Sequence, residues 1–96
     1  MSSMRAVFDR IGRNHSAPSM TIDQVKARSN VVDEDGRTTG EIDWNYVAEK
    51  IEKHARQWIM SSEVQVLIYE REDGTRHGTL LVGGIRNAGS FEIEEL

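Results

Sequence analysis

The sequence predicts an α+β fold in which two short N-terminal helices and one long central helix precede a three-stranded antiparallel β-meander packed on it. Two observations support this prediction. Apolar residues recur at helical spacing in the first two thirds of the chain. In the last third, apolar and polar residues alternate around an Asp-Gly pair that is typical of a hairpin turn. The chain has 96 residues, a length that fits a single domain.

The first predicted helix runs from Met4 to about Arg13, after Ser3 as N-cap. Its apolar stripe has the spacing i, i+3, i+4 and i+7, from Met4, Val7, Phe8 and Ile11. So short a helix is marginal in water, so we expect residues 1–20 to dock on the domain or to form a mobile segment. The second predicted helix follows Thr21 and runs from Ile22 to about Ser29.

The central helix is predicted from Trp44 to about Met60, with Asp43 as its N-cap. Glu49 with Lys53, and Glu52 with Arg56, are acid-before-base pairs at i, i+4. Its apolar face comprises Trp44, Val47, Ala48, Ile51, Ala55, Trp58 and Ile59. The preceding residues 31–42 are predicted either as a small hairpin that turns at Asp35-Gly36 or as an exposed loop.

The meander is predicted to begin with a strand over residues 63–72 and to turn over the two residues Asp73-Gly74. A second turn at residues 87–89 returns the last strand, residues 90–96. In this register Val66 faces Leu81 and Leu67 faces Leu80. The central helix is expected to cover the face formed by Val64, Val66, Ile68, Leu81, Ile85, Phe91 and Ile93.

The opposite face of this predicted sheet is half apolar, whereas a solvated sheet face is mostly polar. Something is therefore expected to cover it, and both the N-terminal helix and a second copy of the chain remain open. Tyr69 is the expected anchor, because contact hot spots favour aromatic residues. The predicted partner-binding residues are Gln65, Leu67, Tyr69, Arg71, Arg76, Leu80, Val82 and Glu94.

Composition excludes several classes of function. The chain has no cysteine, which excludes disulfides and thiolate sites. Its apolar runs are too short for a membrane span or a signal peptide, so we expect a cytoplasmic protein with no membrane partner. We expect no metal or other cofactor, because His15, His54 and His77 share no ligand spacing. No catalytic constellation is found, so an enzyme is not expected.

Nucleic-acid binding is the alternative interpretation. Three helices followed by a hairpin is the order of a winged helix-turn-helix. Arg5, Arg10, Arg13, Lys26 and Arg28 would then contact phosphates. Against this, the exposed face of the central helix mixes Glu49 and Glu52 with Lys50 and Lys53. A helix that binds in a DNA groove should carry charges of one sign, which is positive.

The favoured interpretation is a small, acidic, intracellular protein-interaction or regulatory module. The formal net charge is −4, which disfavours polyanionic partners. We expect a homodimer that acts by binding, such as an inhibitor or accessory protein of bacterial or phage type.

Overall fold

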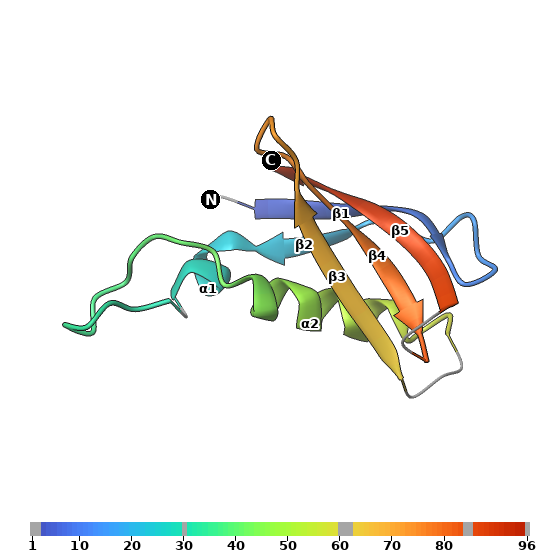
Figure 1. The fold of residues 1–96 in the computed structure, drawn as a ribbon, viewed down its shortest axis with the longest axis horizontal. Helices are drawn as coiled ribbons and strands as arrows, with labels where there is room; N and C mark the ends of the chain where they lie inside the picture. Colours follow the sequence, from blue (N-terminus) through green and yellow to red (C-terminus); the bar gives the residue numbers. More distant parts are fainter. Residues whose placement is uncertain (1–2, 30, 60–62, 84–85, 96) are drawn as a thin grey trace.

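A computed structural model shows a five-stranded antiparallel sheet with two short helices on one face (Figure 1). It describes residues 3–29, 31–59, 63–83 and 86–95. The elements follow the order β1 (Ser3–Ile11), β2 (Met20–Asp23), α1 (Gln24–Ser29), α2 (Trp44–Ala55), β3 (Val64–Glu70), β4 (Arg76–Val82) and β5 (Arg86–Glu95). Across the sheet the strand order is β2-β1-β5-β4-β3. The predicted fold class is therefore wrong, because strands dominate the first quarter of the chain as well as the last third.

The segment predicted as the first helix is the strand β1, which lies between β2 and β5. Its register against β5 shifts between Phe8 and Arg10, so Asp9 is an extra, bulged residue. Met4, Ala6 and Phe8 alternate into the core, and the bulge then brings Ile11 to the same side. A bulged strand can thus imitate helical spacing, which explains the error. Since this segment is part of the sheet, it does not cover the other face as a helix, and no other described helix precedes β1.

The segment predicted as the second helix is divided between β2 and α1. Residues up to Asp23 pair with β1, and only Gln24–Ser29 is helical. The Asp23 carboxylate accepts hydrogen bonds from the backbone N–H groups of Val25 (2.9 Å) and Lys26 (3.4 Å). Asp23 therefore caps the helix where Thr21 was expected to do so.

The N-cap of α2 is confirmed. The Asp43 carboxylate accepts from the backbone N–H groups of Asn45 (3.1 Å) and Tyr46 (3.3 Å). Both predicted ion pairs are present, at 3.7 Å for Lys53 with Glu49 and 2.9 Å for Arg56 with Glu52. The helix ends at Ala55, earlier than predicted, and Trp58 N–H bonds to the Ala55 carbonyl in a tighter final turn.

The β3–β4 hairpin has a three-residue loop, one residue longer than predicted. Arg71 N–H donates to the Thr75 carbonyl, and Gly74 N–H donates to the Arg71 carbonyl. Gly74, at φ 86°, supplies the left-handed residue that such a loop needs. Val66 consequently faces Leu80, not Leu81. A shift of one residue moves every β4 side chain to the opposite face of the sheet.

The β4–β5 connection lies earlier than predicted, between Val82 and Arg86. Residues 87–89 belong to β5, and a register shift leaves Ala88 as a buried bulge. Gly78 is paired with Phe91, and Arg76 with Ile93. The expected pairing of Phe91 with Ile85 is therefore wrong, although Ile85 itself lies outside the described residues.

One hydrophobic core lies between the sheet and the helices. Val47, Ile51 and Ala55 of α2 and Ala27 of α1 pack against the inner face of the sheet. The buried inner-face residues include Met4, Ala6, Phe8, Ile22, Leu80, Phe91 and Ile93. The His54 ring stacks on Phe8 with 5.2 Å between ring centroids, and its Nε2 lies 3.0 Å from the Pro18 carbonyl oxygen.

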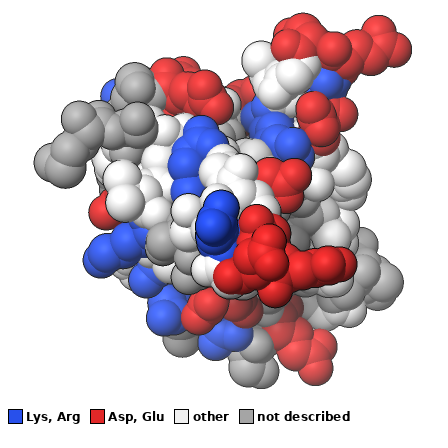
Figure 2. All heavy atoms as spheres, turned by 90° about the vertical axis from the view of Figure 1, so that its left-hand side faces the viewer, with Lys and Arg blue, Asp and Glu red and all other residues white. Residues whose placement is uncertain are grey.

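The connection between α1 and α2 projects from one end of the molecule (Figure 1). Its tip is a minimal, exposed hairpin: Val32 is bridged to Thr38, Asp33 N–H donates to the Arg37 carbonyl (2.8 Å) and Thr39 N–H donates to the Val31 carbonyl (3.1 Å). The predicted small hairpin that turns at Asp35-Gly36 is therefore present. Acidic and basic side chains are intermixed on this end (Figure 2). In the part of the chain that the structure describes, no helix is long and apolar enough to cross a membrane.

Candidate functional site

The outer face of the sheet is the side turned away from both helices. Alternation along the strands directs side chains of all five strands to this face, among them eleven from β1, β3, β4 and β5. We call this set the outer face: Arg5, Val7, Gln65, Leu67, Tyr69, His77, Thr79, Leu81, Ser90, Glu92 and Glu94. Because α1 and α2 pack against the other side, no described element covers it (Figure 1).

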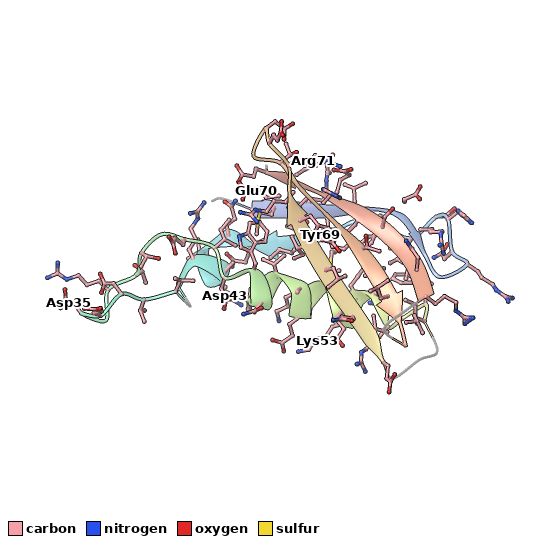
Figure 3. The ribbon with its side chains drawn as sticks, viewed as in Figure 1. Asp35, Asp43, Lys53, Tyr69, Glu70 and Arg71 are labelled. Atoms are coloured by element: carbon pink, nitrogen blue, oxygen red, sulfur yellow. The ribbon has the colours of Figure 1, made fainter. Side chains whose placement is uncertain are left out.

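The structure divides the predicted partner-binding residues between the two faces. Gln65, Leu67, Tyr69 and Glu94 lie on the outer face, and Arg71, which follows β3, donates hydrogen bonds to Glu92 there. Figure 3 labels Tyr69 on β3 and Arg71 just beyond its end. The remaining three residues, Arg76, Leu80 and Val82, lie on the inner side. The expectation that they share one face with Leu67 and Tyr69 is wrong, because the three-residue loop reverses the faces of β4.

The three inward residues have structural roles. Leu80 is fully buried, and Val82 packs against the same core. The Arg76 guanidinium lies 4.0 Å from the ring centroid of Trp44, a cation–π contact between β4 and the start of α2. Leu81, which was expected on the face that the central helix covers, lies on the outer face together with His77. A three-residue hairpin loop would have predicted both positions.

A row of side chains crosses the outer face from Tyr69 through His77 and Glu92 to Val7. The Tyr69 and His77 rings are 5.5 Å apart between centroids. His77 Nδ1 is buried and has no hydrogen-bond partner among the described residues. Tyr69 itself, on the edge strand β3, is 46% exposed and presents a large aromatic surface to solvent.

Arg71 makes a two-pronged contact with Glu92, at 2.7 Å and 2.6 Å. These hydrogen bonds lower the pKa of Glu92 and raise the pKa of Arg71. Across β1 and β5, Arg5 donates to one oxygen of Glu94, from Nη2 at 2.8 Å and from Nε at 3.3 Å. The charged side chains of the outer face are therefore paired with one another, and its apolar side chains are those of Val7, Leu67, Tyr69 and Leu81.

No described strand pairs with the outer edge of β3. β3 is the last strand of the sheet, and among the described elements it contacts mainly β4 and α2. On the β4 side, Arg71 N–H donates to the Thr75 carbonyl, and the Glu63 carbonyl accepts a hydrogen bond from Gly83 N–H. The N–H and C=O groups of successive strand residues point to opposite sides of the strand. The backbone groups of Val64, Val66, Ile68 and Glu70 therefore point away from β4, towards the free edge. The strand carries no Lys, Pro or bulge, the features that usually protect an edge.

A shallow groove runs beside this edge, between α2 and β3. It has a volume of about 270 Å³ and is lined by Asn45, Ala48, Glu49, Glu52, Val64, Gln65 and Val66. A second cavity, of about 560 Å³, lies beneath the β3–β4 hairpin. Its lining mixes Arg71 and Arg76 with Asp73, Glu92 and Glu94.

The chain matches no protein-family model, no curated protein and no solved structure in the comparisons made. The assignment of function therefore depends on the geometry of the chain itself. Among the described residues, no group of three or more His, Asp or Glu side chains is placed to hold a metal ion.

The arginines and lysine of the nucleic-acid alternative do not form one surface. Arg5 is paired with Glu94 on the outer face. Lys26 and Arg28 are on α1, where the Arg28 guanidinium bonds to the Gly40 carbonyl. Arg10 and Arg13 lie at the opposite end of the sheet. Since the first predicted helix is β1, the three-helix order of a winged helix-turn-helix is also absent from the described residues.

Proposed function

We propose that the protein is a small cytoplasmic binding module that pairs with a second copy of itself along β3 and acts by binding and not by catalysis. The observation that carries the proposal is the open edge of β3. A long, apolar edge strand without protective residues is a template for another strand. A regulatory or accessory role, such as inhibition of a larger protein, fits a module of this kind.

The sequence of β3 is suited to antiparallel pairing with itself. With Leu67 opposite its own copy, Val66 faces Ile68 and Gln65 faces Tyr69 across the seam. All four residues whose backbone groups point to the edge then lie opposite one another in hydrogen-bonding pairs. Each pairing also joins side chains on the same face, so two copies would form one continuous sheet with both cores on the same side.

Charge and size are compatible with this pairing. The one charged residue of β3, Glu70, would face Val64, so no like charges oppose each other. Glu49 and Glu52, which line the groove beside the edge, are already paired with Lys53 and Arg56. A stable interface commonly buries about 800 Å² on each partner. One strand pair is smaller than this, so we expect the adjoining α2–β3 groove to contribute.

Light scattering of the Leu67→Lys and Leu81→Lys variants tests the proposal. Both leucines are partly buried on the outer face, but only Leu67 is on the edge strand. Leu67→Lys places two ammonium groups opposite each other where the two β3 strands meet. We therefore expect the dissociation constant of the dimer to rise by about tenfold or more. Leu81→Lys, the matched control, should stay dimeric.

Three results would contradict the proposal. A monomeric wild-type protein across the micromolar range would exclude self-pairing. Equal loss of the dimer in both variants would indicate that outer faces stack on each other. A dimer retained in both variants would place the contact elsewhere on the molecule. Circular dichroism of each variant confirms that the fold is intact.

A further inference from the structure

Three arginines from separate segments line one cavity. These segments lie at the end of the molecule opposite to the α1–α2 connection (Figure 1). Arg10 is on β1, Arg13 is in the β1–β2 connection, and Arg86 begins β5. The cavity has a volume of about 610 Å³, which falls within the common range of small-molecule sites. No Asp or Glu is among its described lining residues.

This distribution of charge is unusual for a chain with 16 acidic and 12 basic residues. The groove beside α2 contains Glu49 and Glu52, and the cavity under the β3–β4 hairpin mixes both signs. Arg13 and Arg86 are exposed and make no ion pair with a described carboxylate. The cavity therefore has a local positive charge that no described side chain neutralises.

The Arg10 guanidinium is held in place by two backbone carbonyls. Its Nη1 donates to Gly12 O at 2.7 Å, and its Nη2 donates to Asn87 O at 3.2 Å. A guanidinium has five N–H donors, so donors remain for a ligand after these two contacts. Carbonyl partners orient Arg10 without cancelling its charge.

We propose that this cavity binds a phosphate ester. One guanidinium is enough to satisfy the two oxygens of a carboxylate, whereas three guanidinium groups suit the larger charge and additional oxygens of a phosphate. Apart from Asn87, the remaining wall is apolar and includes Trp58 and Ile59, both partly buried. This wall would hold the organic part of the ester, with the Trp58 ring available for stacking against a planar group.

Isothermal titration calorimetry with ATP, tripolyphosphate and citrate tests the proposal on the full chain. We expect ATP to bind more tightly than tripolyphosphate, because only ATP has an organic group for the apolar wall. Arg13→Glu and Arg86→Glu should each weaken ATP binding by about tenfold or more, as expected for loss of a charge-assisted hydrogen bond. Arg37→Glu, a charge reversal in the exposed α1–α2 connection, is the matched control and should bind ATP normally.

A Trp44→Phe variant leaves Trp58 as the single tryptophan, so its fluorescence reports directly on the cavity. We expect ATP to change this fluorescence and Arg86→Glu to abolish the change at the same ATP concentration. The proposal is overturned if ATP gives neither heat nor a fluorescence change at millimolar concentration, or if citrate binds as tightly. The proposal is also overturned by a second pattern: a single-stranded oligonucleotide binds tenfold tighter than ATP, and Lys26→Glu weakens that binding as much as the arginine variants do. The arginines would then belong to a nucleic-acid surface.

Discussion

Gly78 lies opposite Phe91 on the inner face of the sheet. A Cβ at this position would overlap the Phe91 ring and the Leu67 carbonyl oxygen. The aromatic ring thus occupies the space that a β4 side chain would need, and it covers the bare backbone of the glycine. Among strand residues, only glycine leaves room for Phe91 to pack there.

Gly78→Ala should therefore destabilise the protein by about 3 kcal/mol, because neither the backbone nor the buried ring can move away without cost. Urea unfolding measures the change. Gly36→Ala is the control, since Gly36 has φ 79° but open space around it, and should cost about 1 kcal/mol. Equal losses in both variants would mean that crowding by Phe91 is not the cause.

The pair formed by Arg71 and Glu92 makes stability depend on pH. Hydrogen bonds from Arg71 are the main cause of the lowered Glu92 pKa. Since the folded-state pKa lies below the unfolded value, the pair stabilises the fold above the ordinary carboxyl pKa of 4.5. This stabilisation is lost as the pH falls through the lower, folded-state pKa.

Glu92→Gln should consequently reduce stability near neutral pH, and the difference from wild type should shrink towards about pH 3. Denaturant unfolding across this range gives the curve. Glu95→Gln is a suitable control, because Glu95 is exposed and forms no ion pair with a described residue. A difference from wild type that stays constant with pH would show that the charge of Glu92 is not responsible.

At the scale of the elements, bulges and loop length decide which side chains reach the core. The bulge at Asp9 brings Ile11 to the inner face of β1, and the bulge at Ala88 realigns β5 with β4. The three-residue loop after Arg71 turns Leu80 inwards and Leu81 outwards. Each bulge, and the longer loop, shifts the side-chain alternation of a strand by one residue. The side chains beyond that point then lie on the opposite face of the sheet.

The start of α2 depends on a single side chain. Asp43→Ala removes the acceptor for two backbone N–H groups and should cost about 1 kcal/mol in thermal or urea unfolding. Asn45→Ala, an exposed position in the first turn, should change stability much less. A similar loss in both variants would mean that general helix propensity, and not the cap, determines the effect.

At the scale of the molecule, the sheet joins the two ends of the chain. β1 pairs along most of its length with β5, so Met4 lies opposite Glu95. The two surfaces proposed for binding are separate: the free edge of β3 ends one side of the sheet, and the three-arginine cavity closes one end of the molecule. Self-association and ligand binding can therefore be tested independently.

The sequence alone determined the local features: the N-cap and ion pairs of α2, the position of the β3–β4 turn, and an apolar second face of the sheet that includes Leu67 and Tyr69. These depend on residues a few positions apart, or on alternation within one strand. Only the tertiary structure decided that residues 3–11 are a strand, because the partner that makes them one lies at the other end of the chain. It also decided the face of every β4 side chain, because one residue in a loop separates the two registers and local patterns tolerate both.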